Sequence, residues 1–546
     1  MRDRLRQCGV LVAITWAAIA LATGPVARGV ANDRALTGNP PTERVFFAFD
    51  TENLAWRSNL KLTLVAPEKH PANPVLRCGP KGSPDYGHAL LYGTVFFDPQ
   101  APGGGKFRMW YLGMIQRELE RGQAPGWWRP MCYAESDDGV TWTKPNLGLV
   151  ELNGNRNNNI CLVESEVPAL ALVNDFLSVL YEPGDPDPSR RYKCAYIAHP
   201  EYKEIRGGMS NVGQKEGRVG AIICATSADG LRWKVVGDRP ANATGERFEV
   251  SSLYRFGDFY FAAGQIASPW ASLTDGRPAG RFMQTYRSPD FVHWSQAKAE
   301  SMVLPDQIIQ PQPSLEDMLT GFSQQMHMGV AVWNRGNVLV GVPGIWQGNA
   351  KQRPKGAVVH EGLRIDLGLA LSSDGVHFRE PIPGFKLLEH GNINQWDSVA
   401  LLQGHAFVNK GELTYLWYSH WDCEEKFRSQ EIGLATIRRD GFGYLSRLDA
   451  GDPGYFMTSP LETKAGAKLS LNVAGVAKET PVRVELYDTL DRPLPEYSGE
   501  QGATVMTSGT RVPISFAAKS PMPERFTVKV TLPDADAVRV YALYAE

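Results

Sequence analysis

Ser136-Asp137-Asp138-Gly139-Val140-Thr141-Trp142 is a turn sequence that this chain repeats. In such a sequence the Ser and Asp side chains accept backbone N–H hydrogen bonds, the Gly adopts a positive φ, and the aromatic residue starts the next strand. The further copies are 227–233, 288–294, which lacks the Gly, 372–378, which ends in Phe, and a weaker one at 438–442. One turn that recurs at long, irregular intervals predicts a repeat fold.

Strand-like segments flank every copy of the turn. Two apolar and aromatic runs precede each copy, a third run carries it and a fourth follows it; in the first unit the first three runs are 94–97, 107–111 and 132–134. Each unit is therefore expected to be a four-stranded antiparallel meander that must stack on its neighbours. We predict an all-β chain with a five-bladed β-propeller over residues 81–455. A large β-sandwich is the alternative, but it does not explain why one turn follows the same pair of strands.

The sequence pattern changes after Pro453, where the turn motif stops. Alternating apolar and polar residues then predict strands at 468–473, 482–487, 512–516, 526–532 and 537–544. We interpret residues 460–546 as a C-terminal β-sandwich. Residues 32–80 are expected to form an N-terminal arm that joins the propeller.

The N-terminus has the pattern of an export signal. Arg2, Arg4 and Arg6 precede an apolar run from Val10 to Ala22, and small residues follow. This order predicts a signal peptide over residues 1–31 and a secreted or periplasmic mature protein. A membrane anchor is the alternative, but the run is short for a bilayer span. No long apolar segment follows, so no membrane contact is expected after cleavage.

Charge and cysteine content exclude several classes of partner. The formal net charge is -2 and the basic residues are scattered, so we expect no nucleic-acid partner. The cysteines other than Cys8 are six, and several lie in apolar strand-like runs, where buried thiols are as consistent with the sequence as disulfides. Their spacing is not that of a structural zinc site, and no metal or cofactor is predicted.

Chemistry is expected at one end of the propeller. The first strand of each blade lines the axis, and the starts of these strands open into one pocket. Two carboxyl groups across such a pocket can hydrolyse a glycosidic bond, because one donates a proton to the leaving oxygen while the other activates water or attacks the sugar. Each carboxylate taken singly could instead cap a turn or pair with an arginine. The residues predicted at the strand starts are Asp175, Glu249 and Asp397 as catalytic groups, and Asp85, His88, His327 and Trp396 as substrate-binding groups. Loop tryptophans such as Trp346 and Trp421 offer further faces on which a sugar ring can stack.

Four segments carry a resemblance to a known group of enzymes. With 107–111, 133–148, 157–160 and 440–442, the chain resembles the five-bladed propeller glycosidases of glycoside hydrolase families 32 and 43. Among them it is most similar to the secreted family-32-like proteins of planctomycete-type bacteria. The likeness spans about residues 40–546. It implies a propeller followed by a chiefly structural sandwich, and leaves open a structural cation at the axis.

The resemblance also implies roles for single residues. In family 32 the second blade opens with Arg-Asp-Pro, whose Asp holds substrate hydroxyls, and Asn174-Asp175 is similar but lacks the Arg and the Pro. The third blade opens with Glu-Cys-Pro, whose Glu is the general acid, and Glu249 falls at that place. The first-blade Asp nucleophile has no counterpart in 88–93. Asp397 as base or pKa modulator, or a water activated by Asp175, would suit an inverting mechanism, and the sequence does not decide between retention and inversion.

The sequence thus predicts a secreted glycoside hydrolase that cleaves an oligo- or polysaccharide in an axial pocket. Because the first-blade Asp is missing, a non-catalytic carbohydrate-binding propeller remains the alternative. A sialidase fits less well, since the Gly follows the Asp one residue sooner than in the sialidase Asp-box and no Arg-Ile-Pro segment is present. A glycoside phosphorylase would need a cluster of basic residues that the sequence does not locate.

Overall fold

The computed structural model describes residues 43–546 except 55, 117–126, 199–220, 238–247, 267–272, 277–280, 305–324, 348–363, 393, 422–429 and 464–466. The predicted signal peptide, residues 1–31, lies outside the described residues. Within the described part the regular elements are β-strands and three short 3₁₀ helices, η1 (Pro168–Ala171), η2 (Pro188–Arg190) and η5 (Gly499–Gln501). No described helix is long and apolar enough to cross a membrane. The prediction of an all-β chain is confirmed.

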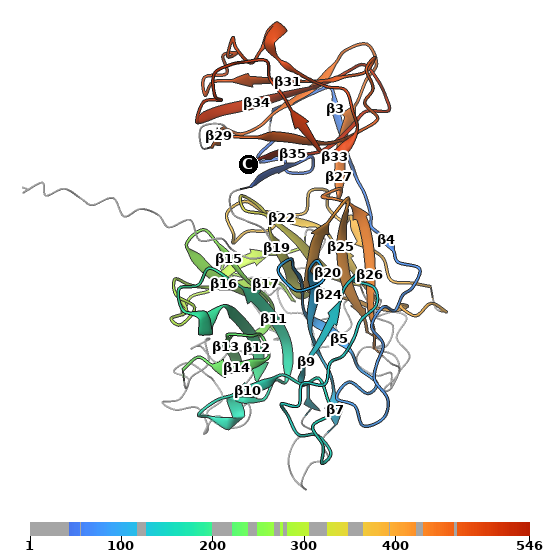
Figure 1. Ribbon diagram of the computed structural model, residues 1–546, viewed down its shortest axis with the longest axis vertical. Coiled ribbons are helices and arrows are strands. Elements are labelled where there is room, and N and C mark those ends of the chain that lie inside the picture. Colours follow the sequence, from blue (N-terminus) through green and yellow to red (C-terminus); the bar gives the residue numbers. More distant parts are fainter. Residues whose placement is uncertain are drawn as a thin grey trace, which may run out of the picture. The chain divides into compact units, whose positions relative to one another are not determined.

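Antiparallel meanders, numbered I to V along the chain, occupy its middle part, and meanders I and V belong to one seven-stranded sheet (Figure 1). Meander I has β5 (Leu90–Asp98), β6 (Lys106–Leu112) and β9 (Met131–Ser136), with the small hairpin β7 (Ile115–Gln116) and β8 (Trp127–Trp128) between β6 and β9. Meander II has β11 (Asp175–Tyr181), β12 (Tyr192–Ala198), β13 (Ala221–Ser227) and β14 (Arg232–Val235), and β10 (Leu162–Glu164) pairs with β14 in parallel. Meander III has β15 (Phe248–Phe256), β16 (Phe259–Ile266), β17 (Met283–Ser288) and β18 (Ala299–Met302).

Meanders IV and V complete this set. Meander IV has β19 (Gln325–Asn334), β20 (Leu339–Gln347), β21 (Arg364–Gly368) with β22 (Ala370–Ser372), and β23 (Lys386–Leu388). Meander V has β24 (Leu401–Lys410), β25 (Leu413–His420) and β26 (Ile432–Arg438). Its outer strand is β4 (Glu68–Lys69), which comes from the N-terminal segment and pairs with β26. Meander V therefore joins segments from the two ends of the set.

The first strands of the meanders contact one another in the order β5, β11, β15, β19, β24 and back to β5. Short hydroxyl side chains connect neighbours: Thr94 Oγ1 accepts from the Val179 amide at 2.8 Å, and Ser178 Oγ accepts from the Leu253 amide at 2.8 Å. Ser252 Oγ does the same for the next strand. Between β24 and β5 the contact is a short parallel pairing. These bonds satisfy backbone donors that face a neighbouring meander rather than a strand of their own sheet.

The repeated turn has the geometry that its sequence predicts. In the first copy Ser136 Oγ accepts from the Gly139 amide at 2.8 Å, and Asp138 Oδ1 accepts from the Val140 and Thr141 amides at 2.8 and 2.7 Å. Gly139 has φ +80°, a conformation that glycine adopts without a Cβ clash. The copies at 227–233 and 372–378 make the same bonds.

Two copies differ from the consensus in instructive ways. In 288–294, where the Gly is absent, Phe291 takes a φ of +67° and its ring is buried. In the weak copy the chain still turns, with the Gly441 amide donating to Arg438 O at 2.8 Å. The Asp440 carboxylate, however, is fully buried. It accepts hydrogen bonds from the Asn409 side-chain amide at 2.9 Å and from the Tyr544 hydroxyl at 2.8 Å. That last copy is therefore part of a buried polar cluster as well as a turn.

Two six-stranded sheets contain the C-terminal strands. One has the order β3 (Leu60–Leu64), β27 (Gly443–Arg447), β35 (Arg539–Ala545), β30 (Leu469–Ala474) and β33 (Gly509–Ile514), with β1 (Arg44–Phe47) paired to β35. The other has the order β2 (Trp56–Ser58), β28 (Gly454–Met457), β34 (Arg525–Leu532), β31 (Val482–Tyr487) and β32 (Ala503–Val505), with β29 (Leu461–Glu462) paired to β34. Apolar side chains of both sheets share one buried cluster.

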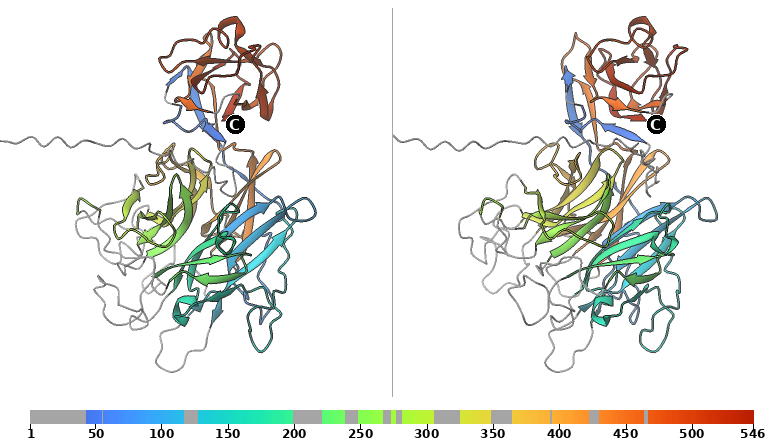
Figure 2. Two further views of the ribbon diagram at one scale, coloured as in Figure 1. Left: turned by 60° about the vertical axis from the view of Figure 1, so that its left-hand side comes forward. Right: turned by 90° about the vertical axis from the view of Figure 1, so that its left-hand side faces the viewer.

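The segment expected to be an arm contributes to both groups of sheets. Its strands β1, β2 and β3 pair with β35, β28 and β27, so the blue N-terminal strands lie among the orange and red C-terminal ones (Figure 1 and Figure 2). Of the strands in this segment, β4 pairs within meander V. Most of the predicted arm therefore pairs with C-terminal strands rather than with the meanders.

A buried ion cluster lies where these segments meet. The Arg335 side chain has no exposed area, and its guanidinium pairs with Asp440 and, at 3.2 Å, with Glu43. It also lies 4.5 Å from the Trp333 ring centroid.

The described cysteines, Cys78, Cys132, Cys161, Cys194 and Cys224, are free thiols. Cys423 lies outside the described residues.

Candidate active site

Each first strand changes register near one end, where its side chains can be redirected. The shift lies between Leu90 and Thr94 in β5, and between Asp175 and Leu177 in β11. The other three shifts are Val250/Ser252 in β15, His327/Val330 in β19 and Gln403/Phe407 in β24. Such bulges rotate the residues that follow them relative to the regular alternation of a strand. All five strands contribute residues at or beside the shift to one cavity.

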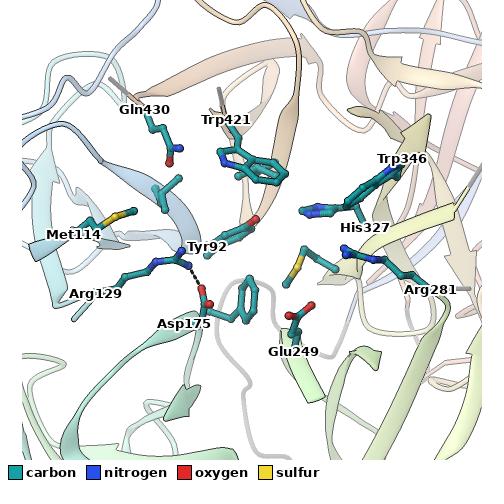
Figure 3. Close-up of a pocket in the computed structure, with 14 residues that line it drawn as sticks. Tyr92, Met114, Arg129, Asp175, Glu249, Arg281, His327, Trp346, Trp421 and Gln430 are labelled. Carbon is teal, nitrogen blue, oxygen red and sulfur yellow. Dashed lines mark hydrogen bonds and ion pairs between the residues drawn. The ribbon is translucent and has the colours of Figure 1, made fainter. Parts of the chain in front are cut away.

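The cavity has a volume of about 260 Å³ and holds ionisable, aromatic and thioether side chains (Figure 3). All five first strands line it, together with residues that precede β9, β17 and β26, residues that follow β6 and β25, and one residue of β20. Its lining consists of Leu90, Tyr92, Met114, Arg129, Asp175, Phe176, Glu249, Arg281, His327, Met328, Trp346, Leu402, Trp421 and Gln430. A cavity of this size, with a few polar groups among apolar and aromatic walls, is typical of a site for a small ligand or one unit of a larger one.

Two carboxylates face this cavity from neighbouring strands. Asp175 is the first residue of β11, and Glu249 is the second residue of β15. The Arg129 guanidinium donates a hydrogen bond to Asp175 Oδ1. The Gln265 side-chain amide donates to Glu249 Oε2. These two hydrogen bonds come from different donors, a guanidinium for Asp175 and a side-chain amide for Glu249.

The Arg129 guanidinium interacts with both carboxylates, Asp175 and Glu249, and with Tyr92 of β5. Burial lowers the pKa of this guanidinium, and the nearby Tyr92 and Glu249 oppose that shift. Figure 3 shows its guanidinium end directed at Asp175, with Tyr92 close by. A cation in this place compensates the carboxylates that share the cavity, which would otherwise repel each other.

Aromatic rings and a second guanidinium form the opposite wall. The Arg281 guanidinium lies over the Trp346 ring, 4.2 Å from its centroid. The His327 ring lies 5.4 Å from the Trp346 ring and 5.6 Å from the Trp421 ring, centroid to centroid. Indole faces of this kind can stack on the C–H face of a sugar, while the charged groups hydrogen-bond to its hydroxyls.

The structure brings together three of the seven predicted site residues: Asp175, Glu249 and His327. Trp346 and Trp421, which the sequence offers as stacking surfaces, also line this cavity. His88 is not among the lining residues, although it forms an isolated β-bridge with Gln430, which is one of them. Burial lowers the pKa of His88, and the nearby Gln430 side chain opposes the shift.

Asp397, Trp396 and Asp85 are placed elsewhere, so the expectation that they share the pocket is not met. The Asp397 carboxylate is buried, pairs with Lys69 Nζ at 2.6 Å and accepts from the Tyr418 hydroxyl at 3.0 Å. The Trp396 ring packs on the Tyr418 ring, with 5.7 Å between the ring centroids. These contacts attach the segment before β24 to meander V and to β4.

Asp85 likewise makes structural contacts, with Tyr111 of meander I and with Lys144. It is buried, accepts from the Tyr111 hydroxyl at 2.9 Å, and pairs with Lys144 at 2.5 Å. Tyr111 in turn accepts a hydrogen bond from Asn159 at 2.9 Å. This polar chain ties the loop that precedes β5 to the body of the meander.

The sequence reasoning missed the two arginines of the cavity. Arg129 lies two residues before β9 and Arg281 two residues before β17, so each precedes the third strand of its meander by the same offset. The sequence contains a signal for both arginines, because the triplets Arg129-Pro130-Met131 and Arg281-Phe282-Met283 occupy the same position in their repeat units. Tyr92 was not predicted, because the group expected at this strand start was a carboxylate.

Described Asp, Glu, His and Cys side chains form no cluster that could hold a metal ion. Among the described lining residues, ionisable groups comprise two carboxylates, two guanidiniums, one imidazole and one phenol. The chemistry that these groups can perform unaided is proton transfer and electrostatic stabilisation, with a proton donor and an acceptor available in one cavity.

No protein-family model matches this chain, and no curated protein matches it by sequence. Solved structures do resemble it. An N-acetylgalactosamine deacetylase from F. plautii, in complex with blood group B trisaccharide, is 13% identical, with 70% of this chain and 96% of that chain covered and a TM-score of 0.40. A family 32 β-fructofuranosidase from Bombyx mori is 12% identical, with 87% and 94% covered and a TM-score of 0.32.

An exo-β-1,3-galactanase from Phanerochaete chrysosporium is 9% identical, with 90% of this chain and 100% of that chain covered and a TM-score of 0.32. The structural neighbours therefore include glycoside hydrolases, the class that the sequence resemblance names.

Proposed function

We propose that this protein is a glycoside hydrolase whose reaction takes place in the cavity between the first strands. The observation that carries the proposal is that Asp175 and Glu249, from the adjacent strands β11 and β15, face one cavity beside stacked aromatic rings. Glycosidic bond hydrolysis needs such a pair, because one carboxyl group donates a proton while the other accepts one. The substrate class is an oligo- or polysaccharide.

In this proposal Glu249 is the general acid and Asp175 is the general base. The ion pair with Arg129 keeps Asp175 ionised, which suits a group that takes a proton from water. Attack by that water on the sugar face opposite the leaving group inverts the anomeric carbon. Asp397 has no part in the reaction, because its carboxylate is engaged by Lys69 and Tyr418.

The proposed architecture is a five-bladed β-propeller followed by a C-terminal β-sandwich. The ring order of the first strands supports the propeller, with meanders I to V as its blades. The pairing of β4 with β26 would then close the ring by joining an N-terminal strand to the last blade. The export pattern of residues 1–31 supports a secreted or periplasmic location.

A second candidate is a carbohydrate-binding propeller without catalysis. It is favoured by β5, which presents Leu90 and Tyr92 to the cavity where a family 32 enzyme would have a carboxylate. The aromatic and charged lining would serve binding equally well. This candidate predicts tight sugar binding without any product.

The test is a screen of the purified chain against polysaccharides and 4-methylumbelliferyl glycosides of the common hexoses, pentoses and uronic acids, with products identified by mass spectrometry. Glu249→Gln and Asp175→Asn are each expected to abolish product release, whereas the exposed control Glu151→Gln is not. Binding without product by the wild type would favour the second candidate. Proton NMR of the first anomer released tests inversion, and a retained anomer would remove Asp175 from the role of base.

A further inference from the structure

Gln265 is a buried residue behind the carboxyl group of Glu249. It has no exposed surface and is not among the residues that line the cavity. On β16 it lies directly opposite Glu249 of β15, so the two side chains project from the same face of the sheet. The neighbouring Gly264 permits this approach, because a Cβ there would lie 2.0 Å from the Glu249 carbonyl oxygen.

The orientation of the Gln265 amide is determined by a backbone group. Its Oε1 accepts a hydrogen bond from the Met328 backbone amide at 2.8 Å. A backbone nitrogen can only donate, so the side-chain oxygen must face it and the NH₂ group must face the other way. That NH₂ group donates to Glu249 Oε2 and lies 3.7 Å from Met328 Sδ.

Local backbone geometry aims the Met328 amide at Gln265. Met328 has φ +70° and Gly329 has φ +93°, inside the register shift of β19. A left-handed conformation is costly for a side chain such as that of methionine, and it persists only where surrounding contacts hold it. In this chain the strained residue both lines the cavity and locks the amide behind Glu249.

We infer that Gln265 is a positioning residue that assigns the proton of Glu249 to Oε1. This inference rests on the proposed role of Glu249 as the acid. Because Oε2 accepts a hydrogen bond from an NH₂ group that cannot turn round, Oε2 serves as the carbonyl-type oxygen of the neutral acid and the proton belongs to Oε1. Gln265 would thereby select one of the two possible protonated forms before substrate binds.

The selection matters for the reaction because a carboxyl group has two oxygens and the glycosidic oxygen needs a proton from one of them. The Oε1–H bond of Glu249 breaks as its proton passes to the glycosidic oxygen, and the bond from that oxygen to the anomeric carbon breaks with its electron pair going to the oxygen. Water adds to the anomeric carbon and gives a proton to Asp175. Gln265 keeps its hydrogen bond to Oε2 of the carboxylate that remains, and solvent restores both protonation states.

The first experiment uses Glu249→Gln as an isosteric copy of the protonated acid and needs no substrate. Neutron diffraction from a deuterated crystal of the full chain locates the deuterium atoms of the introduced amide and of Gln265. We expect the introduced oxygen to accept from Gln265 at the Oε2 place and the introduced ND₂ group to occupy the Oε1 place. The reverse orientation, or a Gln265 oxygen facing position 249, would overturn the inference while leaving the proposed function intact.

The second experiment reads the positioning role through the leaving group. Gln265→Leu is compared with Gln284→Leu, a buried glutamine of the adjacent strand β17 that does not line the cavity. For a sugar that the wild type hydrolyses, Gln265→Leu should lower kcat about tenfold or more for an alkyl glycoside, which depends on acid assistance, and far less for the 2,4-dinitrophenyl glycoside, which does not. Equal losses on both substrates, or the same pattern in Gln284→Leu, would show a structural role only.

Discussion

His405 provides a sharp test of the packing among the first strands. It lies on β24 beside Thr94 of β5, and its Nδ1 is 3.2 Å from Ser178 Oγ of β11. Burial in this place lowers the pKa of His405 from 6.5 to about 4. The neutral imidazole is therefore strongly preferred in the folded chain, whereas the unfolded chain takes up a proton at a much higher pH.

The consequence for stability follows from proton linkage. Above pH 6.5 the imidazole is neutral in both states and its titration contributes no difference. As the pH falls from 6.5 to 4, the unfolded chain binds the proton and the folded chain does not, so the free energy of unfolding falls. A pKa difference of this size corresponds to about 3 kcal/mol at pH 4.

The variant His405→Asn keeps a polar group near the Nδ1 place and removes the titration. Urea unfolding of the two proteins at intervals between pH 8 and pH 4 gives the difference in their free energies of unfolding, in which the carboxylates common to both cancel. We expect this difference to shift by about 3 kcal/mol in favour of the variant between pH 7.5 and pH 4. A constant difference, or an NMR titration of His405 with a midpoint above 6, would refute the packing described for β5, β11 and β24.

Two further predictions concern stability alone. Arg335→Met should lower the free energy of unfolding by about 3–5 kcal/mol, because it removes the guanidinium that pairs with the buried Asp440, whereas Glu43 keeps Arg511 as a second partner; a loss below about 1 kcal/mol in urea unfolding would contradict the buried cluster. Asp138→Ala removes the acceptor of two backbone amides in one turn and should cost about 1–2 kcal/mol by the same measurement. Since Asp138 does not line the cavity, sugar binding and turnover by that variant should match the wild type, and a specific loss of either would argue for a role at the site.

The repeated turn could be predicted from sequence because its interactions are local. Ser136, Asp138 and Gly139 lie within four residues, and their hydrogen bonds depend on little beyond that segment. The same local rules place Phe291 in a left-handed conformation where glycine is missing. The weak copy at Asp440 shows the limit, since its carboxylate binds Arg335 and Tyr544, which are far away in the sequence.

The site could be predicted only in part, because a strand start does not reveal which way each side chain points. A register change of one residue moves side chains to the opposite face of a strand, and β11 and β15 have such a change, whereas β5, β19 and β24 shift by two residues. The Asp175 and Glu249 side chains line the cavity, but the Asp397 side chain contacts Lys69 and Tyr418 instead. The sequence contains no local signal that separates these outcomes.

Long-range pairing explains the other difference between expectation and structure. Arg44–Phe47 pairs with Arg539–Ala545 at the far end of the chain, and Trp56–Ser58 pairs with Gly454–Met457. Strands as short as these are compatible with many sheet edges, so their partners cannot be inferred from composition. The sequence analysis expected residues 32–80 to form an arm that joins the propeller, whereas β1, β2 and β3 pair with C-terminal strands and β4 pairs with β26.

The most direct test of the central claim is the rate of hydrolysis by Glu249→Gln on a glycoside that the wild type cleaves, chosen with an unactivated alkyl leaving group. Removal of the proton donor should lower kcat by about 10²–10⁴-fold while the folded state, followed by circular dichroism and urea unfolding, stays that of the wild type. A variant that folds normally and turns over at the wild-type rate would contradict the assignment of Glu249 as the acid and the proposed mechanism with it.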